Sequence, residues 1–192
     1  EFDEDVSVRK GRVTIDGTVG AGEATDDGLA VTVTLSPAAN TAKSWLFSTF
    51  SPSTAVNGLE ERYMVDGSLT NGTTLTFTRI TNASSVDVLW HLVEFTDEVF
   101  AQQGRTSWTT GASPSPAPTI SSVRMPRTFM TLSTSGSSGA VATGLDEVLV
   151  RGQVSSATAL ALTRETANNT TVNASYSVVQ LPPLKLKARN GG

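Results

Sequence analysis

The chain has 192 residues, a net charge of −4, 17% charged residues, no cysteine and one histidine. This length suits one β-rich domain or two small ones. The lack of cysteine excludes disulfides, thiolate nucleophiles and zinc sites built on cysteine, and a pI near 5.0 argues against nucleic acid as a general partner.

The polarity of the chain comes from hydroxyl groups more than from charges. The sequence contains 28 threonines and 22 serines, while its charged fraction lies below the roughly 25% of typical soluble domains. No apolar run approaches the ~18 residues of a membrane span, so we expect none. No signal peptide is visible. Because residue 1 is a glutamate, we expect that a leader was removed or that the chain begins inside a longer gene product.

Strand patterns follow one another along the chain. Apolar and polar residues alternate in six segments: 12–16, 30–35, 73–80, 86–92, 157–164 and 172–178. A period of two in β-branched residues predicts half-buried strands. Threonine suits the outward positions, because its branched Cβ fits the pleat while its hydroxyl faces water. No window shows a helical stripe.

Turn residues separate these strands. The predicted turns contain Asp16-Gly17, Asp27-Gly28, Asn57-Gly58, Asp66-Gly67 and Asn71-Gly72. The last of these lies between two alternating runs and predicts a hairpin. Alternating prolines over 109–118 favour an extended linker and forbid a central strand.

These boundaries divide the chain into five parts. They are an N-terminal arm (1–11), a first β unit (12–108), a proline-rich linker (109–118), a second β unit (119–181) and a basic tail (182–192). The second unit is near the lower size limit for an independent core without disulfides or metal. We therefore expect the halves to pack together or to be completed by strands from elsewhere.

An internal repeat relates the two β units. The segment Gly58-Leu59-Glu60-Glu61 returns as Gly144-Leu145-Asp146-Glu147, and the order of apolar, glycine and Thr-Arg positions after it is kept. The matched segments include Trp45–Thr49 with Phe129–Thr134, Thr78-Arg79 with Thr163-Arg164, and Val86–Phe95 with Val172–Leu181. This order predicts an all-β fold of two related antiparallel β-sandwich units, jelly-roll or Ig-like, from an internal duplication.

Few side chains suggest chemistry, and we expect no catalytic residue, no cofactor and no metal ligand. His91 lies on the face opposite Trp90, and no Gly-x-Ser-x-Gly motif accompanies it, so an ordinary surface or interface histidine is expected. Glu94 is expected to lie exposed at a bulge. Arg79 and Arg164 end equivalent strands and are expected to close a sheet edge or to pair with an acid.

Two weaker ligand hypotheses remain. Glu23, Asp26 and Asp27 could supply oxygens to calcium, although their spacing fits no EF-hand. Trp45 and Trp90 have aromatic counterparts in the repeat and are expected in the core. Trp108 has none, and it is the candidate interface or ligand aromatic.

The termini carry opposite charge and suggest assembly arms. One arm is acidic and the other basic, and each carries apolar residues that could dock on a neighbouring subunit by strand addition or charge pairing. The candidate arm residues are Phe2, Asp3, Asp5, Leu184, Lys185, Leu186 and Lys187. Two solvated tails are the alternative.

The run from Leu69 to Arg79, followed by Val86–Phe95, resembles β-sandwich repeats of phage virion proteins and bacterial surface proteins. The resemblance covers residues 35–100 and 120–181 and implies display or assembly instead of turnover. We expect a non-enzymatic structural subunit of a large extracellular assembly, first a phage virion component such as a tail, fibre or head decoration. A secreted bacterial or archaeal surface filament subunit or adhesin, and a carbohydrate-binding module, are the alternatives. The expected partners are further copies of the chain, other assembly proteins and a host-surface glycan.

Overall fold

The computed structural model describes residues 6–16, 29–52, 60–80, 84–96, 98–108, 117–137, 148–164 and 171–183. Within these ranges the chain forms eleven β-strands, two short 3-10 turns and no α-helix. All paired strands run antiparallel. The predicted all-β antiparallel fold is thereby confirmed.

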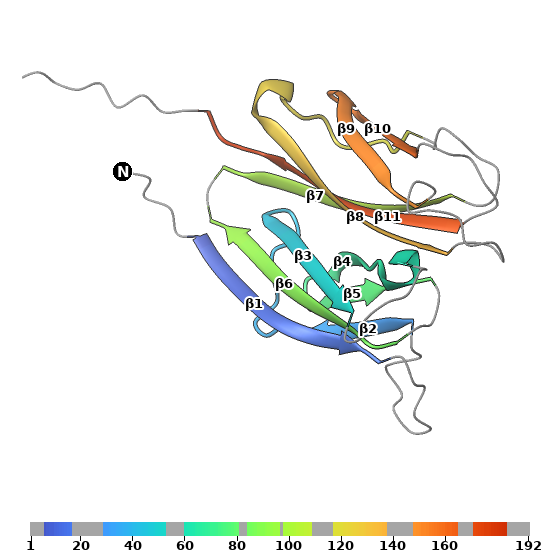
Figure 1. The fold of residues 1–192 in the computed structure, drawn as a ribbon. Coiled ribbons are helices and arrows are strands. Elements are labelled where there is room, and N and C mark those ends of the chain that lie inside the picture. The colour runs from blue at the N-terminus through green and yellow to red at the C-terminus, as the bar shows by residue number, and fades with distance from the viewer. Residues whose placement is uncertain are drawn as a thin grey trace, which may run out of the picture.

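Two three-stranded sheets contribute to a first core. Their strand orders are β1-β6-β3 and β2-β5-β4 (Figure 1). The bounds are β1 Val6–Ile15, β2 Ala30–Thr34, β3 Ser44–Pro52, β4 Asp66–Asn71, β5 Thr74–Thr78 and β6 Val86–Phe95, with a 3-10 turn η1 at Glu60–Tyr63. Side chains from both sheets, among them Leu46, Phe77 and Leu92, form one buried apolar cluster, which we call the first core.

A three-stranded and a two-stranded sheet contribute to a second core. Their orders are β7-β11-β8 and β10-β9. The bounds are β7 Phe100–Trp108, β8 Thr128–Ser137, β9 Val150–Ser156, β10 Ala159–Arg164 and β11 Thr171–Gln180, with a 3-10 turn η2 at Met125–Arg127. Trp108, Leu160 and Val172 belong to this second core. Met64 also belongs to the second core, although it lies between η1 and β4, which are part of the first half of the chain.

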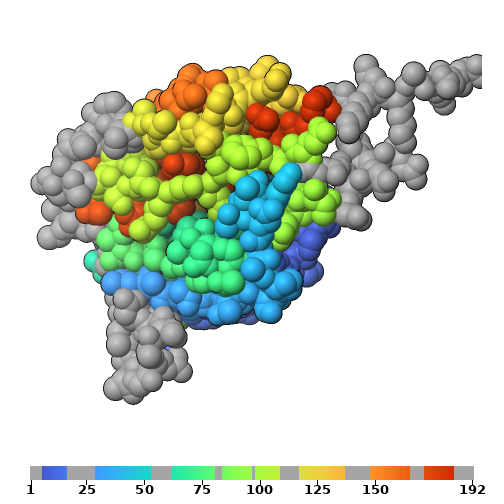
Figure 2. Space-filling view, turned by 180° about the vertical axis from the view of Figure 1, so that it is seen from behind, coloured from blue at the N-terminus to red at the C-terminus, as the bar shows by residue number. Residues whose placement is uncertain are grey.

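The strands around the second core lie directly on those around the first. Figure 2 shows the yellow to red strands stacked on the blue to green ones. Strands β3 and β4 contact the outward face of the β7-β11-β8 sheet. A small apolar cluster of Val99, Ala101 and Val179, with Trp45, Phe95 and Phe129 packed against it, lies between the two cores. The expectation that the halves pack together is therefore met.

The alternating sequence pattern explains which side chains are buried. In β6 the four predicted inward residues, Val86, Val88, Trp90 and Leu92, are at most 7% exposed, while the residues between them are more exposed. The hairpin at Asn71-Gly72 joins β4 to β5 as predicted, and the Asn71 Oδ1 accepts a hydrogen bond of 2.8 Å from the Thr73 N–H.

Other boundaries differ from the expected ones. Strand β1 begins at Val6, so part of the expected N-terminal arm pairs with β6. Strand β7, expected in the first unit, pairs with β11 of the second. Pro118, at the end of the expected linker, accepts a backbone hydrogen bond of 3.0 Å from Leu160 in β10. Alternation predicts that a segment is extended, but it does not identify the strand with which that segment pairs.

A glycine in β7 makes room for an aromatic ring in β11. A Cβ on Gly104 would lie 2.3 Å from the Tyr176 hydroxyl oxygen and 2.5 Å from its ring carbon Cζ. Burial also raises the pKa of this tyrosine, because the charged form loses solvation. Close packing of this kind leaves no space for an added methyl group.

We expect Gly104→Ala to destabilise the protein by about 1–3 kcal/mol through overpacking. Thr106→Ala, on the same strand and face, is the control and should cost less, because it removes atoms from a partly buried site that holds no such contact. Thermal denaturation followed by circular dichroism measures both. Equal melting temperatures for Gly104→Ala and the parent would contradict the packing described.

Candidate functional site: the seam between the two cores

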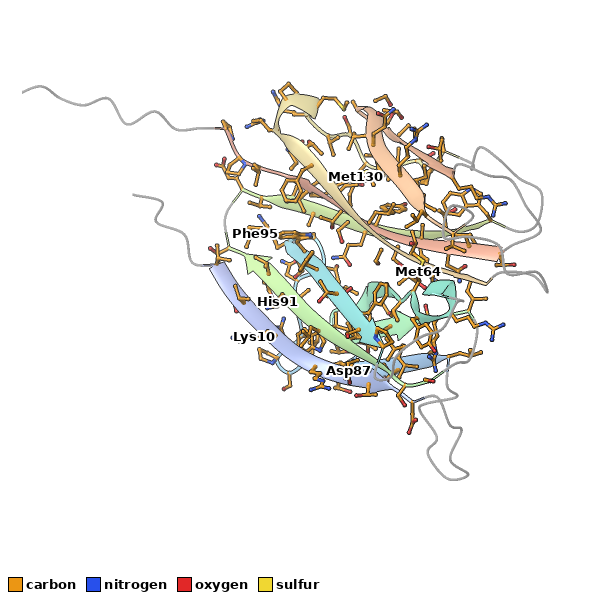
Figure 3. The ribbon with its side chains drawn as sticks, in the orientation of Figure 1. Lys10, Met64, Asp87, His91, Phe95 and Met130 are labelled. Atoms are coloured by element: carbon orange, nitrogen blue, oxygen red, sulfur yellow. The ribbon has the colours of Figure 1, made fainter. Side chains whose placement is uncertain are left out.

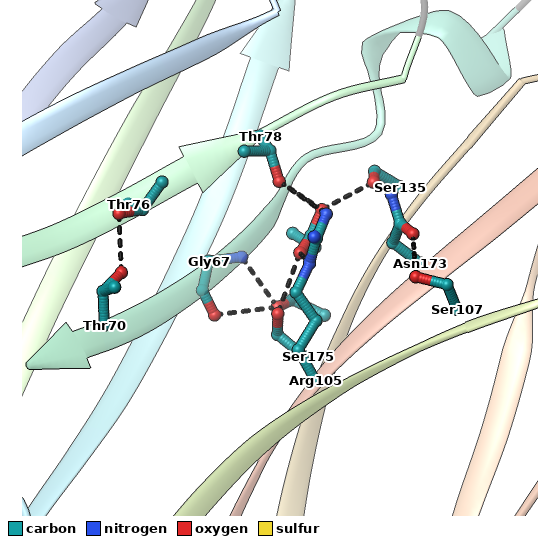
Figure 4. A network of polar contacts seen from close by, with 11 residues as sticks. Gly67, Thr70, Thr76, Thr78, Arg105, Ser107, Ser135, Asn173 and Ser175 are labelled. Atoms are coloured by element: carbon teal, nitrogen blue, oxygen red, sulfur yellow. Dashed lines mark hydrogen bonds and ion pairs between the residues drawn. The ribbon is translucent and has the colours of Figure 1, made fainter.

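A buried aspartate joins the two parts of the molecule. Asp66, the first residue of β4, is 1% exposed. Its Oδ2 accepts hydrogen bonds from Arg105 Nε at 2.7 Å and Ser175 Oγ at 2.8 Å. Its Oδ1 accepts from Ser135 Oγ and Thr78 Oγ1, each at 2.6 Å (Figure 4). The donors come from β5, β7, β8 and β11, so one carboxylate on β4 connects four other strands in two sheets.

Electrostatics explain why these donors are needed. An ionised carboxylate loses several kcal/mol of hydration on burial unless charge and hydrogen bonds replace it. The Arg105 side chain is 41% exposed, so water screens part of its attraction to Asp66. The hydroxyls of Ser135 and Ser175 are in buried residues and supply the remaining stabilisation at short distance. We call the contact between the two cores, centred on Asp66, the seam.

Further polar contacts extend the seam. The Gly67 N–H donates to Ser133 Oγ at 3.0 Å, and Gln103 Nε2 donates to the Ser44 carbonyl at 2.8 Å. Trp45, which was expected in the core, lies in the seam. Its indole N–H donates to Thr131 Oγ1 at 2.9 Å, and its ring meets Phe129 edge to face at a centroid distance of 5.4 Å.

A cavity of about 210 Å³ lies in the seam between β3, β4, β8 and β11. Leu46, Gly67, Thr131 and Ser177 are among the residues that line it. Among the described residues of its lining, none carries a carboxylate, imidazole or amine. The nearby carboxylate of Asp66 is already held by four donor residues. The arrangement therefore acts as a structural clamp.

At one end the outward face of the β1-β6-β3 sheet packs on the strands of the second core through Trp45 and Phe95, and the rest of this face is open and partly apolar. We call this surface the open face. Three of its large apolar side chains are exposed: Val8 at 55%, Phe47 at 44% and Leu89 at 51%. Figure 3 labels Lys10, Asp87 and His91 on this sheet.

One ion pair lies on the open face. The Arg12 guanidinium donates to the Asp87 carboxylate, and Thr14 Oγ1 donates to it at 2.7 Å. The hydrogen bond from Arg12 is the larger cause and that from Thr14 the smaller, and together they lower the pKa of Asp87 below its ordinary value. The hydrogen bond between Arg12 and Asp87, and then the negative charge of Asp87, raise the pKa of Arg12.

The predicted site residues are spread over the fold. His91 is exposed on the open face, as expected, with its ring 6.5 Å from that of Phe47. The expected bulge at Glu94 is wrong, because β6 pairs with β1 and β3 without a register shift through this residue. Glu94 forms an ion pair of 3.0 Å with Arg9.

The two arginines that end equivalent strands are both 3% exposed. Arg79 donates to the backbone carbonyls of Ser84 at 2.7 Å and Asp16 at 3.2 Å. It therefore holds together the ends of β1, β5 and β6. Arg164 occupies the corresponding end of β10.

Trp108 is not an exposed ligand aromatic. It is 1% exposed within the second core, which leaves no ring face for a sugar or a partner. The prediction failed because β7 contributes to the second core, where alternation turns Trp108 inward. The candidate arms and calcium ligands lie outside the described residues: Phe2, Asp3, Asp5, Glu23, Asp26, Asp27, Leu184, Lys185, Leu186 and Lys187.

Two searches within the described part of the chain found nothing. No cluster of three or more His, Asp or Glu side chains that could hold a metal ion occurs there. No helix in the described ranges has the length and apolarity needed to cross a membrane. Comparisons with protein-family models, curated proteins and solved structures found no match for the chain.

The seam predicts a difference between two aspartates that are both paired with arginine. Asp66→Asn replaces an acceptor by an amide whose NH₂ group faces other donors, and we expect it to cost about 2–4 kcal/mol. Asp87→Asn, on the open face, is the matched control. It should barely change the free energy of unfolding, because solvent screens exposed pairs. Urea denaturation of both variants measures the difference. Similar losses for the two variants would contradict the role of Asp66.

Proposed function

We propose that the chain is a non-enzymatic structural subunit of a large extracellular assembly, first a phage virion component such as a tail, fibre or head decoration. The observation that carries this proposal is the open face. Apolar side chains at 44–55% exposure, grouped on one sheet with charged neighbours, are typical of surfaces that another protein covers. The resemblance of the chain to phage virion and bacterial surface repeats points the same way.

Two related sandwich units from an internal duplication are part of this proposal, and strand register supports them. In the first half, Leu46 of β3 lies opposite Leu92 of β6. At the matched positions of the repeat, Met130 of β8 lies opposite Val178 of β11. Two strand pairs that agree in partner and register are hard to explain by similar composition alone.

The glycines support the same duplication. Gly11 of β1 lies opposite Trp90 of β6, and an added Cβ would be 2.7 Å from the indole. Gly104 of β7 lies opposite Tyr176 of β11 with the same kind of contact. Trp90 and Tyr176 are matched positions of the sequence repeat, so the equivalence extends to β1 and β7. A duplicated unit is a ready building block for an assembly that repeats.

A secreted surface filament subunit or adhesin is the second candidate, because a filament would cover the open face equally well. The carbohydrate-binding alternative lost its candidate aromatic when Trp108 proved to be buried.

Sedimentation velocity over a wide concentration range tests the proposal. We expect species heavier than the 20.1 kDa monomer. Leu89→Lys should shift them toward monomer, because it places a charge on the surface that associates. Leu181→Lys changes a leucine of similar exposure, 42%, away from the open face and is the control. A parent chain that stays monomeric at every concentration would overturn the proposal.

A further inference from the structure

We propose that copies of the chain stack head to tail, and that each contact between copies repeats the geometry of the internal seam. The edge formed by β8 and β9 of one copy would dock on the open face of the next. This inference rests on the proposed function and names the partner as a second copy of the chain.

The seam consists of an edge placed on a sheet face. The edge comes from the first half, where Met64 and Asp66 lie at the start of β4. Met64 is 7% exposed and packs into the second core, and Asp66 binds Arg105, Ser135 and Ser175 on the outward face of the β7-β11-β8 sheet.

The second half carries the same edge, and within the part of the chain that the structure describes its Leu149 and Arg151 are exposed. Gly67 lies opposite Phe77 in the first half, and Gly152 lies opposite Leu162 in the second, so β4 corresponds to β9 in register. Leu149 and Arg151 then correspond to Met64 and Asp66.

Their exposures differ sharply from those of their counterparts. Leu149 is 52% exposed where Met64 is 7% exposed, and Arg151 is exposed where Asp66 is 1% exposed. The link to the neighbouring strand is kept, because Arg151 Nε donates to Thr163 Oγ1 at 3.0 Å as Thr78 donates to Asp66.

The open face corresponds to the face that the seam covers. Arg105 lies opposite Ser175 in the covered sheet, and Arg12 lies opposite Leu89 in the open one. Ser175 is 3% exposed, whereas Leu89, at the matched position, is 51% exposed.

The charged groups of this contact differ from those of the seam. In the covered sheet Arg105 binds Asp66 of the edge. At the position of Arg105 the open face carries Arg12, which binds Asp87. A docked Arg151 would therefore lie beside an ion pair that is already formed, and apolar contact carries the docking.

The symmetry of the assembly follows from these surfaces. An edge and a face on different sides of one chain make a heterologous contact, in which every added copy leaves a new edge and a new face. Such contacts generate a ring if the rotation closes and a filament if it does not.

Cysteine cross-linking tests the contact directly, because the chain contains no cysteine of its own. Arg151 and Leu89 correspond to Asp66 and Ser175, which are in hydrogen-bond contact in the seam. The double variant Arg151→Cys with Leu89→Cys should give a ladder of multimers on non-reducing gels after mild oxidation. Arg151→Cys with Thr70→Cys, at an exposed site of β4, is the control and should give dimers at most.

A charge variant that leaves the open face intact completes the test. Leu149→Glu should weaken association on the order of tenfold or more, because it places a charge against the apolar side chains of the open face. Arg124→Glu changes an exposed arginine, just before η2, and should leave association unchanged. Unchanged melting curves verify that both variants fold.

The outcomes separate the two proposals. A ladder together with weaker association of Leu149→Glu supports the head-to-tail contact. A parent chain that assembles while the double-cysteine variant gives no ladder, or while Leu149→Glu associates normally, overturns the contact and leaves the proposed function standing. A parent chain that never associates overturns both.

Discussion

The arrangement of the two cores depends on the hydrogen bonds that the carboxylate of Asp66 accepts. A buried negative charge needs donors within hydrogen-bond distance, and those donors lie on strands of both parts of the molecule. If the cores moved apart, the acid would lose Arg105, Ser135 and Ser175 together. The same requirement makes the seam directional, because an apolar contact alone would tolerate sliding, whereas hydrogen bonds to one carboxylate allow a single register.

The many hydroxyl residues take on a specific role in this structure. Where the β7-β11-β8 sheet is covered, its outward face carries serines that bind the opposing edge. Ser135 and Ser175 donate to Asp66, and Ser133 accepts from the Gly67 N–H. Where the β1-β6-β3 sheet is open, Leu89 and Phe47 are exposed instead. One chain therefore carries a polar sheet face that is satisfied internally and a partly apolar sheet face that is exposed.

Local alternation in the sequence was enough to predict six of the eleven strands, the Asn71-Gly72 hairpin and the inward side of β6, because each depends only on neighbouring residues. Asp66 was taken for a turn residue, since Asp-Gly is common in turns. Its true role depends on Arg105 and Ser175, which are distant in sequence, and local patterns carry no such information. Ser175 and Ser177, outward-facing on the predicted strand over 172–178, were the available sign of a covered polar face. The prediction of an exposed Trp108 failed for a related reason, because strand pairing, which local patterns do not show, decides which core a strand joins.

The central claim is that one kind of joint relates successive β units, both within a chain and between chains. Electron microscopy of the assembled protein, with reconstruction at a resolution that separates the two halves of each chain, tests this claim most directly. The account predicts a uniform series in which the rotation and translation from the first half to the second equal those from the second half to the first half of the next copy. A two-fold dimer, or two different joints that alternate along the assembly, would contradict it.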